Sequence, residues 1–216
     1  MTQHAPLFIV LLPVSAALLC MLFSRIQKNL GSWIVIASIV GAFLSAVTSL
    51  QQVIADGGKP IHYWMGNWQP PLGIEFVIDP ISGALAVLIT FISLLGAIYS
   101  LPFVKEEGWL HIGGYYTLYG LMTVGMCGMV ITGDVFNLYV FLEVMSLSGY
   151  GLIAIGGKKS MLAAFRYLLI GTIGASLYLL GVGYMYALTG TLNMADMAVR
   201  AAEFLNYPLF ALALAC

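Results

Sequence analysis

The sequence predicts an all-α polytopic membrane protein built around six apolar segments, each long enough to cross a lipid bilayer. Hydrophobic residues make up 61% of the 216 positions and charged residues only 8%, whereas a soluble domain carries about 25% charge. The mean hydropathy is +0.99. The formal net charge of −1 offers no basic surface for a nucleic acid, so the expected partners are the lipid bilayer and other membrane subunits.

Six spanning helices are predicted from runs of about 20 or more mainly apolar residues. We expect them at about residues 5–24, 30–54, 80–104, 112–133, 134–156 and 161–189. A seventh apolar segment at 206–216 has eleven residues, too few to cross the hydrocarbon core. The expectation is therefore one transmembrane domain that corresponds to the N-terminal part of a longer protein.

The distribution of basic residues predicts that the N-terminus lies outside the cell. With that orientation, the inner connections hold six basic residues and the outer connections hold two. The inner set is Arg25, Lys28, Lys105, Lys158, Lys159 and Arg166, and the outer set is Lys59 and Arg200. Because Lys and Arg are enriched on the cytoplasmic side of membrane proteins, this asymmetry favours a multi-pass protein with an outer N-terminus.

Residues 55–79 form the one sizeable connection without a helical pattern, and they predict a small extracytoplasmic β-hairpin between the second and third helices. Gly66 and Asn67 lie between aromatic residues, as in a tight type II′ hairpin turn. Residues 74–79 then alternate in part between apolar and polar positions, as a half-buried strand does.

A short amphipathic helix is predicted within residues 190–205, along the outer surface. Thr191 or Asn193 can cap its start, because both carry a side-chain oxygen. Asp196 precedes Arg200 by four positions, so one face of this helix can hold the oppositely charged pair.

Glu143 is the most informative residue, because it is a carboxylate nine positions beyond Asp134 inside an apolar run. If Asp134 marks one membrane surface, Glu143 lies about 13 Å deep, near the middle of a ~30 Å hydrocarbon core. An unpaired charge at that depth costs at least about 2.5 kcal/mol, so the group needs a proton, a partner or water. Glu143 is therefore a candidate ion-handling group.

Residues three, four and seven positions from Glu143 share its helical face, and three of them carry hydroxyl groups: Tyr139, Ser146 and Tyr150. These hydroxyls can hydrogen-bond a carboxylate or hold a short water chain. Asp134 projects from nearly the opposite side and is expected at the surface. Two interpretations of Glu143 are open: a proton-binding site that a moving cation loads and empties, or a permanently protonated group bonded to a tyrosine or a backbone carbonyl.

Arg166 and His111 are secondary candidates for an ion path. Arg166 lies about five residues into the sixth predicted helix, and it either snorkels to the inner surface or belongs to the path. His111 lies near the inner end of the fourth helix, where it decorates the interface or passes protons. The cysteines and histidines have no metal-ligand spacing, and no nucleotide loop or haem-binding motif occurs, so no metal or cofactor is expected.

Three stretches resemble the antiporter-like proton-pumping membrane subunits. Residues 133–154 read GDVFNLYVFLEVMSLSGYGLIA and resemble the fifth-helix motif of that family. Residues 68–83 resemble the hairpin that leads into the third helix, and residues 165–194 resemble the sixth helix with the loop after it. The family includes the D-type subunits of Mrp sodium/proton antiporters, which this sequence resembles most, and related membrane subunits of complex I and of membrane-bound hydrogenases.

The resemblance implies a fold of about fourteen helices with two inverted five-helix repeats, in the plasma membrane of a prokaryote. It also implies that Glu143 matches a fifth-helix glutamate that pairs with a lysine on a broken seventh helix. No such lysine lies within these 216 residues.

These observations give a leading hypothesis and two alternatives. The leading hypothesis is the N-terminal part of a proton-translocating subunit of an Mrp-type or complex I-like assembly, in which Glu143 handles protons and other subunits couple them to sodium or to electron transfer. The first alternative is a structural protein that helps such a complex assemble without transporting ions. The second is a subunit of a quinone-linked, NADH dehydrogenase-like oxidoreductase, which rests only on the association of relatives with redox complexes. No catalytic residue is expected in this chain itself.

Overall fold

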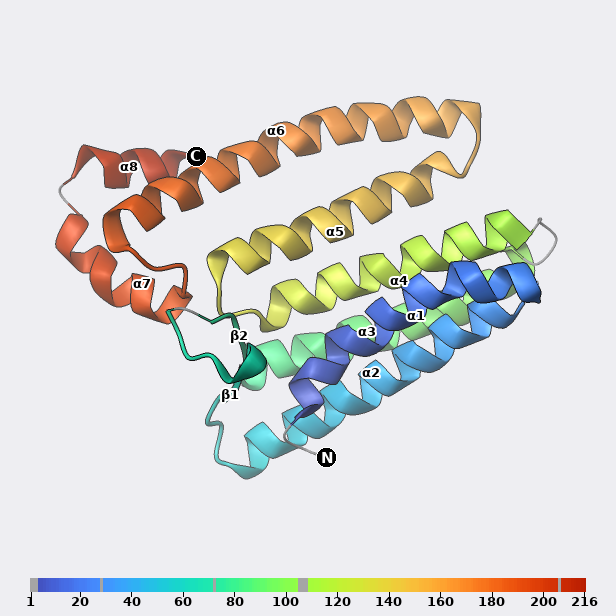
Figure 1. The fold of residues 1–216 in the computed structure, drawn as a ribbon, viewed down its shortest axis with the longest axis horizontal. Helices are drawn as coiled ribbons and strands as arrows, with labels where there is room; N and C mark the ends of the chain where they lie inside the picture. The colour runs from blue at the N-terminus through green and yellow to red at the C-terminus, as the bar shows by residue number, and fades with distance from the viewer. Residues whose placement is uncertain (1–3, 28, 72, 105–108, 206) are drawn as a thin grey trace.

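The computed structural model describes residues 4–27, 29–71, 73–104, 109–205 and 207–216, and these residues are mainly helical (Figure 1). The helices are α1 (Ala5–Ile26), α2 (Leu30–Ala55), α3 (Pro80–Val104), α4 (Trp109–Ile131), α5 (Val135–Ala154), α6 (Lys158–Thr189), α7 (Met194–Ala201) and α8 (Pro208–Ala215). Of the helices described, α1 to α6 are long and apolar enough to cross a membrane. The predicted polytopic helical fold is confirmed.

The fourth and fifth spanning helices are separated by a short link, although the sequence predicts that they meet end to end. α4 ends at Ile131 and α5 begins at Val135. Asp134 accounts for the new start, because its side chain caps α5 by accepting a hydrogen bond from the Asn137 amide at 2.7 Å.

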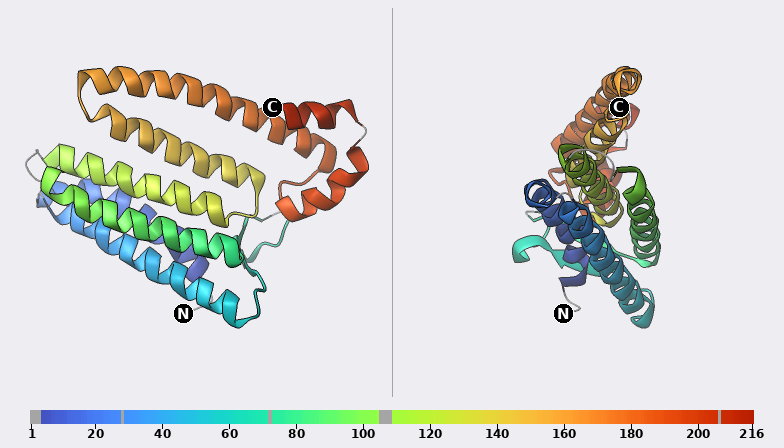
Figure 2. Two further views of the ribbon diagram at one scale, coloured as in Figure 1. Left: turned by 180° about the vertical axis from the view of Figure 1, so that it is seen from behind. Right: turned by 90° about the vertical axis from the view of Figure 1, so that its right-hand side faces the viewer.

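Helices α1 to α4 form a bundle, and α5 and α6 lie against it as two successive layers, α5 on α4 and α6 on α5 (Figures 1 and 2). The close approach of α4 and α5 depends on a small residue at position 125. A Cβ atom added to Gly125 would lie 2.6 Å from the backbone nitrogen of Met145 and 2.7 Å from the carbonyl oxygen of Phe141. Small residues allow such backbone contact between helices in lipid.

The predicted β-hairpin between α2 and α3 is confirmed. Its strands are β1 (Ile61–Trp64) and β2 (Glu75–Ile78), which pair antiparallel with Trp64 opposite Glu75. The connection between the strands therefore covers residues 65–74 and is much longer than a two-residue turn.

The predicted type II′ turn at Gly66 and Asn67 is wrong. The two residues do form a tight turn, closed by a hydrogen bond from the Trp68 amide to the Met65 carbonyl at 3.3 Å, but both have φ of 63°. A type II′ turn requires positive φ at only its first central residue. Burial rather than the turn sets the strand register, because Phe76 and Ile78 are 2% and 0% exposed against the helices.

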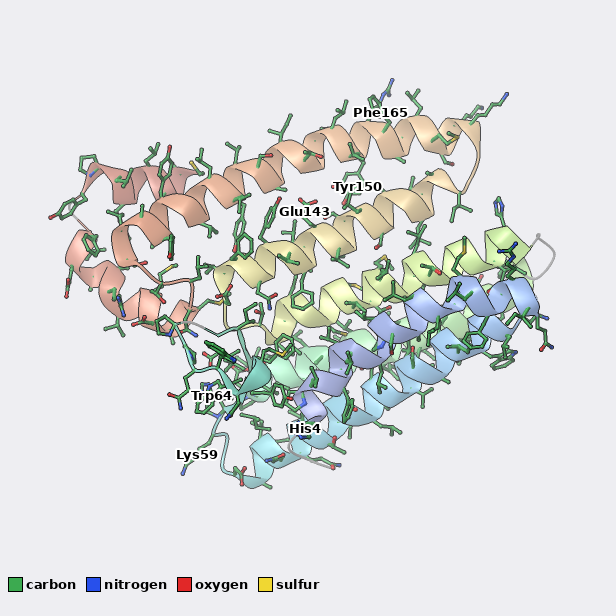
Figure 3. The ribbon with its side chains drawn as sticks, viewed as in Figure 1. His4, Lys59, Trp64, Glu143, Tyr150 and Phe165 are labelled. Carbon is green, nitrogen blue, oxygen red and sulfur yellow. The ribbon has the colours of Figure 1, made fainter. Side chains whose placement is uncertain are left out.

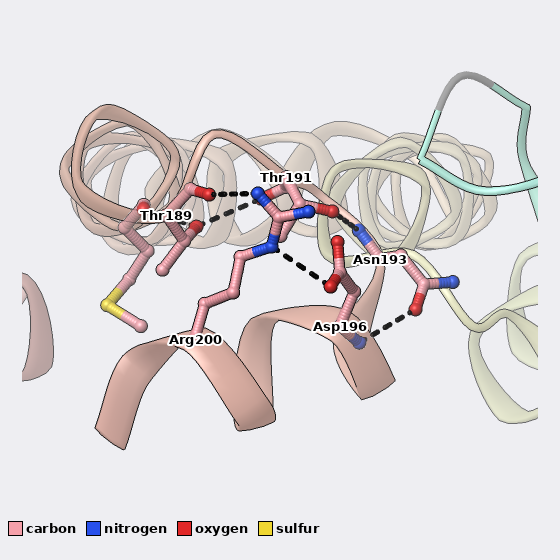
Figure 4. Close-up of polar contacts among 6 residues, drawn as sticks. Thr189, Thr191, Asn193, Asp196 and Arg200 are labelled. Atoms are coloured by element: carbon pink, nitrogen blue, oxygen red, sulfur yellow. Dashed lines mark hydrogen bonds and ion pairs between the residues drawn. The ribbon is translucent and has the colours of Figure 1, made fainter. Parts of the chain in front are cut away.

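The predicted amphipathic helix is α7, and Asn193 caps it. The Asn193 side chain accepts a hydrogen bond from the Asp196 amide at 3.1 Å. Arg200 donates from Nε to Asp196 at 3.0 Å, which confirms the predicted pair and lowers the pKa of the Asp196 carboxyl. Arg200 also donates from Nη1 to the Thr189 carbonyl at 3.1 Å (Figure 4). This contact ties α7 to the end of α6, where carbonyl groups lack partners within the helix.

The described basic residues lie toward the two ends of the spanning helices. Those at the end with the α5–α6 connection include the exposed residues Arg25, Lys158 and Lys159, whereas Lys59 and Arg200 lie at the hairpin end. Lys28 and Lys105 of the predicted inner set lie outside the described residues, as does Asn206, where the seventh predicted segment begins. These described members of the predicted inner set therefore share one end, and the predicted outer set shares the other.

Asp79 stabilises the first turn of α3, and its removal gives a testable change. Its Oδ1 accepts a hydrogen bond from the Ser82 amide at 2.7 Å, and the Ser82 hydroxyl accepts one from the Asp79 amide at 2.8 Å. We expect Asp79→Ala to lower the free energy of unfolding in detergent by about 1 kcal/mol near neutral pH, the usual cost of a lost cap. Hydrogen exchange at the Ser82 amide should increase.

The effect of Asp79→Ala should depend on pH in one direction. The hydrogen bond from the Ser82 amide holds the pKa of the Asp79 carboxyl below its usual value. A carboxyl with a lowered folded-state pKa stabilises the fold above its unfolded-state pKa, and this stabilisation is lost as pH falls through the folded-state pKa. The difference between variant and wild type should therefore shrink in acid. Asp56→Ala removes an exposed acid at the end of α2, and it should change neither the free energy of unfolding nor hydrogen exchange at the Ser82 amide.

Candidate functional site

Glu143 lies near the middle of α5. It is the ninth residue of a 20-residue helix, which places it about 12 Å along the axis from Val135. No other Asp or Glu occurs within the six spanning helices as the structure describes them. The side chain is partly exposed.

The face of α5 that carries Glu143 is directed toward α6. The ring of Tyr139 stacks on Tyr178 of α6, with 6.4 Å between centroids and 8° between planes. Tyr150 meets Tyr167 of α6 edge to face at 4.8 Å. Because Glu143 lies between these tyrosines on the same helical face, it also faces α6, as Figure 3 shows.

A small residue of α6 lies opposite Glu143. The two helices run antiparallel, so moving along α5 from Tyr150 to Tyr139 corresponds to moving along α6 from Gly171 to Tyr178. Ala175 shares this face of α6 and is 6% exposed. The α5–α6 seam therefore has aromatic rings on both sides of Glu143 along the helix, and Ala175 lies at about the level of Glu143.

Among the described residues, the Glu143 carboxylate has no hydrogen bond and no ion pair. The structure brings Tyr139 and Tyr150 to the same seam, one on each side of Glu143 along the helix. Ser146 is half-buried on α5. The hydroxyl groups of these three candidates make no hydrogen bond to Glu143 within the part of the chain that the structure describes. A carboxylate with these surroundings needs a proton, water or a cation from elsewhere.

The two secondary candidates lie away from Glu143. Arg166 is exposed on α6, one residue before Tyr167 and so at the level of Tyr150 rather than of Glu143. His111 is exposed near the start of α4, at the end of the bundle opposite the hairpin. Neither pairs with an acidic residue among those described.

A second polar cluster lies at the hairpin end and was not predicted as a site. Glu75 of β2 is 5% exposed, its Oε1 atom accepts a hydrogen bond from the Asn193 side-chain amide at 2.6 Å, and its Oε2 atom lies 3.2 Å from the Nδ1 atom of His62. Asn193 is the residue that caps α7. The alternation in β2 hints at a polar residue at position 75, but the partner 118 positions away in the chain could not be inferred.

Backbone hydrogen bonds extend this cluster into a loop junction, a name we use for Glu75, Thr132, Gly133, Asp134 and Asn193. The Gly133 amide donates a hydrogen bond to the Glu75 carbonyl at 3.0 Å. Phe76 pairs with Thr132, and Asp134 pairs with Asn193, each pair as an isolated antiparallel β-bridge. The junction joins the hairpin, the α4–α5 link and the α6–α7 link. It fixes the hairpin-side ends of α5 and α6, and thus the seam that holds Glu143.

Asp134 corrects one expectation from the sequence. It lies at a helix end as predicted, but it is only 8% exposed, because the hairpin and the α6–α7 link cover it. Burial raises the pKa of the Asp134 carboxyl, while amide hydrogen bonds from Asn137 and Phe136 oppose that shift.

No group of three His, Cys, Asp or Glu side chains that could hold a metal ion is found among the described residues. The three cysteines are free, and Cys20 and Cys127 are buried.

Six apolar helices, a hairpin at one end and a carboxylate halfway along a spanning helix define a multi-pass membrane protein with an intramembrane acid. The family described as NADH:quinone oxidoreductase/Mrp antiporter, TM matches residues 132–215, which include α5 with Glu143 and the whole of α6. The chain belongs to this family of antiporter-like membrane subunits.

Two relatives illustrate the range of the family. The chain is 44% identical over 214 residues to the N-type subunit of the NADH-quinone oxidoreductase of Desulforudis audaxviator (strain MP104C), a match that covers 99% of this chain and 42% of the relative. It is 32% identical over 195 residues to the D-type subunit of the Na(+)/H(+) antiporter of Bacillus subtilis (strain 168), covering 90% and 38%. The sequence motifs favoured the D-type subunit, whereas the N-type subunit shares the larger identity of these two. The chain spans about two fifths of the length of both relatives.

Two solved structures have the same fold. A chain of the membrane-bound sulfane sulfur reductase, an archaeal respiratory membrane complex, matches with a TM-score of 0.90 and 33% identity over 99% of this chain and 43% of that one. A chain of the Mrp complex from Dietzia sp. DQ12-45-1b matches with a TM-score of 0.76 and 26% identity, covering 99% and 40%. Homologous chains thus occur in multi-subunit membrane complexes.

Proposed function

We propose that this chain is part of a proton-translocating membrane subunit, in which Glu143 binds and releases the transported proton. One observation carries the proposal: Glu143 is the only Asp or Glu in the six described spanning helices, and it lies halfway along α5 without a polar partner among the described residues. Intramembrane carboxylates are costly, and proteins that retain them commonly use them for ion or proton transfer.

The chemistry requires a cation that approaches and leaves Glu143. Desolvation favours the neutral carboxylic acid, and a nearby positive charge favours the carboxylate, so a moving cation would load and unload the proton. Tyr139, Ser146 and Tyr150 would contribute hydroxyl groups to a water chain along the α5–α6 seam. Arg166 and His111 lie too far along their helices to serve as the direct partner and remain secondary members of a path.

The partner would come from polypeptide that covers α5 and α6. In the most apolar stretch of α4, 44% of the residues are buried, but the corresponding shares are 11% in α5 and 17% in α6. We therefore expect other segments or subunits of a multi-subunit complex to pack here. Protons would be the ion handled by Glu143, and sodium would be coupled through those other subunits.

We further propose that the chain lies in the plasma membrane of a prokaryote with its N-terminus outside. The excess of basic residues at the α5–α6 end supports a cytoplasmic location for that end. The hairpin, the loop junction and α7 would then face the outside.

A structural role in assembly is the second candidate. The observation that favours it is the broad apolar surface of α6, where Phe165, Ile170 and Ile173 are 57%, 73% and 64% exposed. Such a surface can hold neighbouring helices together without any ion passing through the chain.

Labelling with dicyclohexylcarbodiimide tests the proton-binding role directly. This apolar reagent adds to protonated carboxyl groups, so we expect an adduct on Glu143 of the full chain in its membrane. The yield, measured by mass spectrometry of peptides, should fall as pH rises. The exposed Glu203 provides an internal control and should stay unmodified. An unlabelled Glu143, or equal labelling of both residues, would count against the role.

A further inference from the structure

Two hollows adjoin at the hairpin end of α1. The first is a polar cavity of about 580 Å³ between the start of α1, the end of α2 and the hairpin. Its lining includes His4, Gln52, His62, Tyr63, Trp64 and Asn67. None of the described lining residues is acidic.

The second hollow is an apolar groove of about 220 Å³ between α1, the hairpin and α5. Its lining includes Leu7, Leu11, Val14, Ile74, Phe76 and Phe141. Asn137 is the one polar side chain described in it, and its amide is already bonded to the Thr132 hydroxyl at 2.9 Å. Leu11 and Ile74 are 45% and 39% exposed, so the groove opens to the surroundings.

The residues that line the two hollows follow one another along α1 and along the hairpin. His4, Leu7, Leu11 and Val14 recur at helical spacing, so His4 in the polar cavity stands directly before the residues that line the groove. On the hairpin, Trp64 lines the cavity and the next residue, Met65, lines the groove. From Leu7 to Val14 the groove runs about 10 Å, which is about two thirds of one leaflet of a ~30 Å hydrocarbon core.

We propose that this combined hollow binds one phospholipid, with the phosphate in the polar cavity and part of an acyl chain in the groove. A polar cavity above an apolar groove at the end of a spanning helix matches the layout of a lipid headgroup above its chain. The exposed Trp64 and Trp68 beside the cavity fit the aromatic belt at a membrane interface.

The polar cavity presents hydrogen-bond donors that suit a phosphate. The Nδ1 atom of His4 is engaged with the Tyr63 hydroxyl at 3.0 Å, and that of His62 with Glu75 at 3.2 Å. Because a carboxylate only accepts, His62 donates from Nδ1 to Glu75, and its Nε2 atom donates to a phosphate from the protonated ring. When His4 donates from Nδ1 to the Tyr63 oxygen, the Tyr63 hydroxyl is left to donate to the phosphate. Lys59 lies at the same end of the molecule, as Figure 3 shows. Of the acids in this region, Glu75 is buried against His62, Asp79 lines a neighbouring hollow together with His62, and Asp56 is exposed at the end of α2.

The test measures binding of phosphatidylglycerol to the delipidated full chain by native mass spectrometry. Leu11→Trp places a ring in the groove, and Leu18→Trp makes the same change two turns further along α1, where the side chain is 63% exposed. We expect wild type and Leu18→Trp to bind one lipid with the same affinity. Leu11→Trp should raise the Kd about tenfold, which corresponds to about two methylene groups displaced from the groove.

A further variant and a competing ligand distinguish phospholipid from the other possible occupants of the hollow. Tyr63→Phe removes a headgroup donor but keeps the ring, and it should weaken phosphatidylglycerol binding while leaving binding of an uncharged diacylglycerol unchanged. Millimolar inorganic phosphate should not displace the lipid. The proposal fails if both tryptophan variants bind alike, if phosphate alone competes fully, or if cross-linking from position 11 in the native membrane captures a neighbouring subunit in place of lipid.

Discussion

Replacing Glu143 by Gln is expected to reduce the rate of proton translocation about a hundredfold in proteoliposomes that contain the complex of this chain. This factor is the lower end of the range of rate losses that follow removal of a positioned proton-transfer group. Gln has nearly the same shape and can hydrogen-bond, but it cannot release a proton. Because Glu143 is only half-buried on the α5–α6 seam and bonds to no described residue, the substitution should leave the fold intact. A pH-sensitive dye inside the vesicles measures the rate.

Two further variants serve as controls for Glu143→Gln. Glu203→Gln makes the same chemical change at an exposed acid beyond α7 and should leave the rate unchanged. Glu143→Asp keeps a titratable carboxyl one methylene shorter and should restore part of the rate. Transport by Glu143→Gln at the wild-type rate would refute the role that we assign to this residue and favour the assembly function.

Replacing Glu75 by Ala is expected to cause the largest loss of stability, about 3 kcal/mol in the free energy of unfolding in detergent. The buried carboxylate holds the Asn193 amide at 2.6 Å, and hydrogen bonds to charged groups contribute about 1.5–3 kcal/mol. Its loss also leaves the buried Asn193 amide without that partner and opens a gap beside Gly133. Since the loop junction holds three connections together, hydrogen exchange should rise in β2, in the α4–α5 link and at the start of α7 together.

His62→Ala is the matched control for this variant. It removes the other partner of Glu75, but the His62 side chain is 47% exposed, so the pair contributes at most about 1 kcal/mol. Equal destabilisation by the two variants, or a change in exchange confined to the hairpin, would show that Glu75 does not tie the three connections together.

The sequence was sufficient to predict the spanning helices and the intramembrane acid. Hydropathy is a local property of the sequence. Because lipid offers the backbone no hydrogen-bond partners, an apolar spanning segment forms its backbone hydrogen bonds internally, as a helix. For this reason the predicted start of the third span at residue 80 coincides with that of α3, and Glu143 lies within α5 as predicted. The family resemblance also depends on local motifs and is confirmed by the match to residues 132–215.

Only the tertiary structure decided which surfaces meet. The sequence placed Asp134 at the surface, but the hairpin and the α6–α7 link bury it. The Gly66-Asn67 pair suggested a two-residue connection between the strands, yet the burial of Phe76 fixed a register in which the connection is longer. The bond from Asn193 to Glu75 and the orientation of Glu143 toward α6 depend on contacts between distant segments. Such contacts follow from the packing of whole helices, which no local pattern of residues encodes.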